Sequence, residues 1–216
     1  MDNESSIDLE YKILLLGDSS SGKEDLLVRY TGNSFEDVQS GTVGVDVKYK
    51  VIAKDNKKIR LNIWNTSGQE KFHSLCISTV SGADGIILIC DITNKETFRK
   101  FGNWLVELEE LFHKGKVEII IIANKIDLED QRQISENELK EYGEKHNIKV
   151  FNASAKTGEG VEEAFDYLIN RIINNKYCGN EGIRCNDENE FNNRKRYFKL
   201  IQRDNNKNTN TKKNNC

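Results

Sequence analysis

Four short apolar runs along the chain have the length and composition of buried strands. They cover residues 11–16, 85–90, 117–123 and 149–152. Nearly continuous apolar runs of this length are typical of parallel strands that are covered on both faces. We therefore expect four parallel strands of the buried type.

Two further segments alternate between apolar and polar residues, as strands with one exposed face do. They cover residues 45–53 and 57–64, and Asp55 and Asn56 stand between them. Asp and Asn are common in the tight turns that join antiparallel strands. The two segments are predicted to form a β-hairpin.

Segments with apolar residues at three- and four-residue spacing fill the gaps between the strands. They cover residues 22–30, 95–112, 135–146 and 161–173. Strands that alternate with helices predict an α/β fold, in which helices cover both faces of a mostly parallel sheet. In such a sheet the ligand binds beyond the carboxyl ends of the strands.

Length and composition favour one domain and a tail. Of the 216 residues, 37% are hydrophobic and 31% are charged, which suits a globular domain over residues 1–174. Residues 175–216 are rich in Asn and basic residues, so we expect a disordered, hypervariable tail. From Lys176 onward there are ten Lys or Arg and five Asp or Glu. An acidic body with a basic tail favours an anionic surface as the tail's partner, and not nucleic acid.

The chain shows no pattern of a membrane-spanning or secreted protein. No apolar run approaches the roughly 20 residues of a transmembrane helix, and the first ten residues lack a signal-peptide pattern. The five cysteines form no clustered pairs, which argues against a disulfide framework. Cys76 and Cys90 lie in apolar stretches and are expected to be core thiols. We expect a cytosolic protein.

A phosphate-binding loop follows the first predicted strand and precedes a helix. Its residues are Gly17, Asp18, Ser19, Ser20, Ser21, Gly22 and Lys23. Glycines let the backbone wrap a phosphate chain with its N–H groups pointing inward, and the helix N-terminus adds a favourable dipole. Lys23 is predicted to reach the outer phosphates.

Two short motifs at later strand ends indicate a guanine site. In the first, Asn124, Lys125, Ile126 and Asp127, the Asp127 carboxylate would accept hydrogen bonds from the two N–H groups that guanine, and not adenine, presents. Asn124 and Lys125 would tie the loop together and cover the base. The second motif, Ser154, Ala155 and Lys156, would offer a backbone N–H to the base oxygen.

Two loops have the residues of a switch that senses the terminal phosphate. Gly68 would let a backbone N–H approach that phosphate, and Gln69 would orient the hydrolytic water. Thr42 would bind the metal and the terminal phosphate only when that phosphate is present. Both loops are therefore expected to order with GTP and to be released with GDP.

With these motifs, the chain resembles the small GTPases of the Ras superfamily, and within them the Rab family. The resemblance covers roughly residues 9–173. It extends to segments 41–46 (GTVGVD), 63–64 (IW), 68–72 (GQEKF) and 103–108 (NWLVEL). It implies a P-loop G-domain fold: a six-stranded, mostly parallel sheet with one antiparallel edge strand, flanked by five helices.

The resemblance also implies a function and its partners. It implies a nucleotide-dependent switch in vesicle and membrane traffic that cycles between GTP and GDP forms with slow hydrolysis, uses Mg²⁺, and packs Phe35 against the guanine. An exchange factor, a GTPase-activating protein and effectors would act on a monomer at the cytosolic face of an endomembrane.

Two residues of the magnesium site depart from the family pattern. Glu24 stands where the family has Ser or Thr as a metal ligand, and Asn65 stands where it has an Asp that holds the metal through water. In one hypothesis, Glu24 has taken over as the carboxylate of the site. In the other, the site is damaged, because a carboxylate without metal repels the phosphates. Thr42 would complete the metal site.

These departures leave a second function open. The chain would then be a hydrolysis-deficient binding module that acts through protein contacts. Val47, Thr79 and Val80 replace the aromatic residues of the usual Rab effector surface, and Ser67 replaces an alanine. A P-loop kinase or ATPase is disfavoured by the guanine motif.

The last residue, Cys216, indicates a lipid anchor. Rab proteins are usually anchored through two lipidated C-terminal cysteines, whereas this chain ends in one. A single lipid chain gives only marginal membrane binding, and the basic tail would supply the second attraction. An unmodified cysteine is the alternative.

Overall fold

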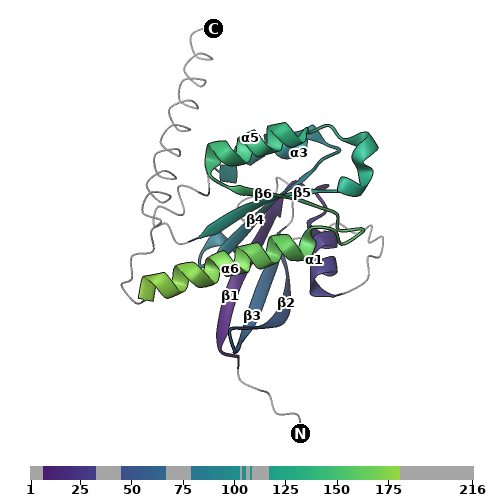
Figure 1. Ribbon diagram of the computed structural model, residues 1–216. Helices are drawn as coiled ribbons and strands as arrows, with labels where there is room; N and C mark the ends of the chain where they lie inside the picture. Colours follow the sequence, from purple (N-terminus) through teal and green to yellow (C-terminus); the bar gives the residue numbers. More distant parts are fainter. Residues whose placement is uncertain are drawn as a thin grey trace.

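The computed structural model describes residues 7–32, 45–66, 79–102, 104–105, 108 and 117–180, with side chains as far as residue 176. Six strands and five helical segments have both of their ends within these residues (Figure 1). The strands are β1 (Leu9–Gly17), β2 (Val45–Lys54), β3 (Lys57–Thr66), β4 (Gly85–Asp91), β5 (Glu118–Asn124) and β6 (Lys149–Ala153). The helices are α1 (Lys23–Thr31), α3 (Lys95–Arg99), the 3₁₀ helix η2 (Ile126–Gln131), α5 (Glu136–His146) and α6 (Val161–Asn180).

The strands form one sheet in the order β2-β3-β1-β4-β5-β6. Strand β2 pairs antiparallel with β3 at one edge, and all other neighbours pair in parallel. The predicted fold, a mostly parallel sheet with one antiparallel edge strand, is confirmed. Because β1, β3, β4, β5 and β6 run in the same direction, their carboxyl ends meet at one edge of the sheet.

Two apolar cores lie on the two faces of the sheet, because successive residues of a strand point to opposite sides. On one face, Ile13 and Leu15 of β1 pack with side chains of α1 and α6. On the other, Leu14 and Leu16 pack with residues that follow α3 and with α5. Figure 1 shows α1 and α6 together on one side of the sheet. The middle strand β4 is buried along its whole length, as its continuous apolar sequence predicts.

Most helices match their predicted positions, with differences at their ends. The helix predicted over residues 95–112 is interrupted, because α3 ends at Arg99 and helix resumes at Phe101. The predicted capping box of α5 is present, with Ser135 and Glu138 bonding to each other's backbone. Helix α6 continues to Asn180, beyond the apolar pattern that ends at Ile173. The short helix η2 begins within the guanine motif, at Ile126, and was not predicted. The tail was predicted from residue 175, so residues 175–180 are helical where disorder was expected. Residues 181–216 of that tail, and parts of the helix predicted over residues 95–112, lie outside the described residues.

The backbone conformation of the turn in the β2–β3 hairpin can be tested by substitution. Asp55 and Asn56 both have left-handed backbone angles, with φ of 49° and 57°. A β-branched residue is strained there, whereas Gly is not. Asn56→Val is therefore expected to lower the free energy of unfolding by about 1–2 kcal/mol. Asn56→Gly is expected to keep or slightly raise it, and urea unfolding of both variants measures the difference. Equal stability of the two variants would contradict the assigned turn.

Candidate functional site

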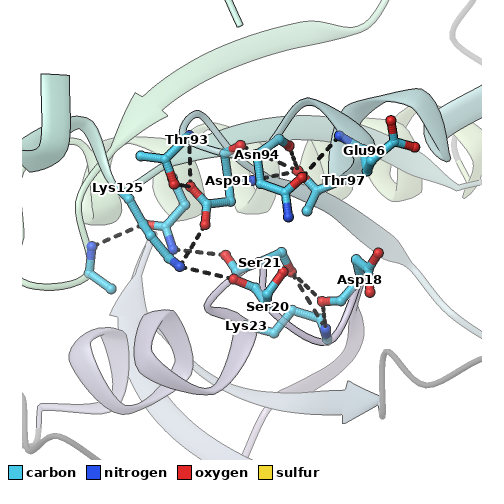
Figure 2. Close-up of polar contacts among 12 residues, drawn as sticks. Asp18, Ser20, Ser21, Lys23, Asp91, Thr93, Asn94, Glu96, Thr97 and Lys125 are labelled. Carbon is cyan, nitrogen blue, oxygen red and sulfur yellow. Dashed lines mark hydrogen bonds and ion pairs between the residues drawn. The ribbon is translucent and has the colours of Figure 1, made fainter. Parts of the chain in front are cut away.

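The phosphate-binding loop joins β1 to α1, and its own groups close it. The backbone N–H and the hydroxyl of Ser21 both donate to the carbonyl of Asp18, at 3.1 and 2.8 Å. The Lys23 ammonium donates to the carbonyl of Gly17 at 3.0 Å. It also donates to the carbonyl of Asp18 at 2.6 Å (Figure 2). Lys23 is buried, although it is charged. A buried cation at the start of a helix favours an anion such as a phosphate chain.

Gly22 lets this loop turn into α1 against the guanine motif. It caps the helix with a left-handed backbone, φ 79°. A Cβ atom at this position would lie 2.4 Å from Nδ2 of Asn124. That same Nδ2 donates to the carbonyl of Ser21 at 3.0 Å. The close approach of Gly22 to Asn124 thus fixes the spacing between the phosphate loop and the end of β5.

The two predicted guanine motifs meet each other at the ends of β5 and β6. The backbone N–H of Ala155 donates to Oδ1 of Asn124 at 3.1 Å, and both residues are buried. The Ser154 hydroxyl donates to the Asp127 carboxylate at 2.6 Å. Asn124 therefore bridges both of its partners, the Ser21 carbonyl and Ala155. The three segments that the sequence assigns to the nucleotide form one connected network.

Comparison with known proteins places this arrangement in a family. The sequence model of the Ras family matches residues 12–174. The chain belongs to the Ras family. It is 42% identical to the Ras-related protein Rab-18-B of Danio rerio over 162 residues, which are 75% of this chain and 78% of the relative.

Other similar proteins are also Rab proteins. Identity to Rab-18 of Lymnaea stagnalis is 39% over 170 residues, covering 79% of this chain and 84% of the relative. Identity to Rab-8B of Bos taurus is 42% over 170 residues, covering 77% and 80%. This Ras-family chain is thus a Rab-like GTP-binding switch of membrane traffic. The relatives do not favour the alternative of a binding module without turnover.

The family in general binds GTP and GDP together with Mg²⁺. For that ion the sequence predicts two residues that depart from the family pattern, Glu24 and Asn65. Asn65 is 1% exposed at the carboxyl end of β3, next to Leu15 of β1 in register. Glu24 lies in the first turn of α1, directly after Lys23, and is partly exposed. Both side chains carry oxygen donors, which Mg²⁺ prefers, so the pair fits the ion in donor chemistry.

Arg29 is a site residue that the sequence analysis missed in this Ras-family chain. It lies on α1, and its Nε donates to the carbonyl of Ala155 at 2.8 Å. A second guanidinium nitrogen donates to the carbonyl of Lys156. Arg29 thereby holds the second guanine motif against the helix that begins at the phosphate loop. No sequence pattern indicated this contact, because its partners lie more than a hundred positions away.

Lys100 is a second missed residue, and it contacts the phosphate loop directly. Its ammonium lies 2.7 Å from Oδ2 of Asp18, and Oδ1 of Asp18 accepts from the Ser19 backbone at 2.6 Å. Burial alone would raise the pKa of Asp18, but the hydrogen bonds from Lys100 and Ser19 and the charge of Lys100 lower it overall. Asp18 therefore stays ionised at neutral pH and holds the loop to the end of α3.

Several predicted site residues lie outside the described residues. These are Phe35, Thr42, Gly68, Gln69 and Cys216. Their roles remain predictions from the sequence. In the described part of the chain, no helix is both long and apolar enough to cross a membrane.

Proposed function

We propose that this Rab-like switch holds guanine nucleotide in the connected network described above. The phosphates would lie at residues 17–23 with Thr42 and Gly68, and the base at Phe35, Asn124, Lys125, Asp127 and residues 154–156. Gln69 would position the hydrolytic water. The observation that carries the proposal is the double contact of Asn124, which donates to Ser21 and accepts from Ala155. One side chain thus links the phosphate loop with both guanine motifs.

The magnesium ion would be held by Glu24 as carboxylate ligand, with Thr42, and with Asn65 acting through water. The usual pair of a hydroxyl and an Asp carries one negative charge, and Glu24 with Asn65 carries the same charge. When bound, the ion would neutralise the phosphates and support hydrolysis. The chain's own part is to supply oxygen donors beside Lys23, whose buried ammonium already lies at the loop.

Binding of nucleotide to purified, stripped protein tests this function. Affinities for GDP, GTP and ATP are measured with and without Mg²⁺. We expect GDP and GTP to bind more tightly than ATP by roughly a thousandfold or more, because a site built around polar contacts rejects a base that leaves them unpaired. We also expect Mg²⁺ to strengthen guanine binding. Equal binding of ATP would overturn the guanine assignment, and indifference to Mg²⁺ would overturn the role of Glu24.

The proposed place of action is the cytosolic face of an endomembrane, with Cys216 as the lipidated residue. The Rab relatives are the support for this proposal, since Rab proteins are typically peripheral on such membranes. The nucleotide state would be set by an exchange factor and a GTPase-activating protein and read by effectors, with the chain as a monomer.

Loss of Cys216 is expected to move most of the protein from membrane to cytosol in a eukaryotic cell that prenylates proteins. The basic tail alone contributes about 1 kcal/mol per Lys or Arg near an anionic surface, which does not replace the buried lipid chain. Fractionation of Cys216→Ser against the wild type measures the change. Cys178→Ser is the control and is expected to stay on the membrane. An unchanged distribution of Cys216→Ser would mean that the tail binds without a lipid.

A further inference from the structure

Asp91 is a buried carboxylate at the edge of the sheet where the nucleotide motifs meet. It ends β4 and is 3% exposed. Its Oδ1 accepts hydrogen bonds from the backbone N–H and the hydroxyl of Thr93, at 2.8 and 2.6 Å. Its Oδ2 lies 2.6 Å from the ammonium of Lys125 (Figure 2). The two oxygens therefore have different tasks: one closes a local turn and the other faces the guanine motif.

Lys125 links Asp91 to the phosphate loop. The same ammonium that meets Asp91 donates to the carbonyl of Ser20 at 3.0 Å. The Lys125 backbone is left-handed, with φ 71°, which a residue with a side chain rarely adopts. A strained backbone of this kind persists where its surroundings hold it. Asp91 and Ser20 hold the far end of this side chain, and Asn124 precedes it in β5.

The orientation of Asp91 is in turn set by α3. Its backbone N–H donates to the hydroxyl of Thr97 at 3.0 Å, and that hydroxyl donates to the carbonyl of Asn94 at 2.7 Å. Asn94 caps α3 by accepting from the N–H of Glu96. The first turn of α3 thus fixes the end of β4, from which the carboxylate reaches Lys125.

We propose that Asp91 is a positioning residue for nucleotide binding, which acts through Lys125. Its carboxylate keeps the Lys125 ammonium against the Ser20 carbonyl, and so keeps the phosphate loop and the guanine loop at one spacing. The inference rests on the proposed nucleotide site. Without the carboxylate, Lys125 turns its partly exposed ammonium to solvent and releases Ser20, because a cation in a poorly solvated site needs a counter-charge. Bound GDP then leaves faster.

The substitution Asp91→Asn tests this step with little other change. The amide keeps one oxygen for Thr93, while its NH₂ group replaces the oxygen that faces Lys125. We expect GDP to dissociate at least about tenfold faster than from the wild type, as measured with a fluorescent GDP analogue. Thr93→Val is the matched control, because it removes a hydrogen bond to the other oxygen of Asp91 and leaves the ion pair intact. This variant is expected to release GDP within twofold of the wild-type rate.

A double variant separates positioning from a merely structural role. If Asp91 acts through Lys125, then adding Asp91→Asn to Lys125→Met changes the GDP dissociation rate by less than twofold. A structural role would add the full tenfold factor in either background, and that result would overturn the proposal. The comparison needs only Lys125→Met and the double variant. It therefore stands even if the unpaired lysine prevents Asp91→Asn from folding. The wild type in the same series tests the nucleotide site itself, because failure to bind GDP there would refute the proposed function and not only this inference.

Discussion

An alanine at Gly22 is expected to weaken GDP binding about a hundredfold, which corresponds to about 2.7 kcal/mol. Two effects combine at this position. The backbone has φ 79°, which costs a residue with a Cβ atom about 1–2 kcal/mol. The new Cβ would also lie 2.4 Å from Nδ2 of Asn124, so Asn124 must move and lose its bond to Ser21. Because Asn124 links the phosphate loop to the guanine motifs, its displacement reaches the whole site. Calorimetric titration with GDP measures the loss.

Gly82 provides the matched control for this experiment. It has a similar backbone, φ 74°, but a Cβ there would meet no atom within 4 Å. Gly82→Ala is therefore expected to lower the free energy of unfolding by about 1–2 kcal/mol while leaving GDP affinity unchanged. A Gly22→Ala protein that binds GDP as the wild type does would show that the phosphate loop tolerates a shift of Asn124.

The sheet of this protein could be predicted because most of its parallel strands are continuous apolar runs in the sequence. Residues 85–90 are continuously apolar, and β4 is buried throughout. The antiparallel hairpin followed from alternation and from the Asp55–Asn56 turn. The phosphate loop and the guanine motif could be placed at one edge because both follow such runs. The strands, the hairpin turn and the two loops are each determined by neighbouring residues in the sequence, so the pattern of apolar and polar residues predicts them.

The contacts that hold the site together were less predictable. Asp91 directly follows a predicted buried strand, as Asn124 does, so the same rule would have found it too. Arg29 and Lys100 do not follow a predicted strand. Their partners are brought close only by the assembled sheet, at sequence separations of 126 and 82 residues. A sequence pattern identifies residues that end a strand, but not those that reach the site from a helix.

The length of α6 was underestimated for a related reason. The apolar stripe ends at Ile173, and the next three residues, Asn174, Asn175 and Lys176, are polar. In the structure, Lys176 pairs with Asp84 at 2.7 Å, and Asn175 bonds to the buried Glu118. Arg171 pairs with the same carboxylate of Glu118 at 3.3 Å. Polar contacts at the start of β5 and just before β4 thus hold residues 171–176 of α6, and apolar periodicity does not detect such contacts.

Restoring the family residues at Glu24 and Asn65, which we propose for the magnesium site, is expected to give strongly non-additive effects. Glu24→Ser alone removes the proposed carboxylate, and we expect it to weaken Mg²⁺-dependent GTP binding by about tenfold or more. Glu24→Ser with Asn65→Asp returns the family arrangement and is expected to recover that loss. Residues that share one ligand commonly couple by about 0.5–3 kcal/mol. The measured quantity is the Mg²⁺ concentration at which half of the nucleotide is retained.

The sign of the single substitution decides between the two hypotheses for this site. If Glu24 binds the ion, its loss weakens nucleotide retention in Mg²⁺ and has little effect in chelator. If Glu24 instead faces the phosphates without metal, like charges repel by a few kcal/mol at an effective dielectric constant of about 20. Its removal would then tighten nucleotide binding even in chelator, and the proposed carboxylate role would be wrong. Asn65→Asp alone adds a second carboxylate, so a rebuilt site should gain little from it, whereas a damaged site should gain Mg²⁺ dependence.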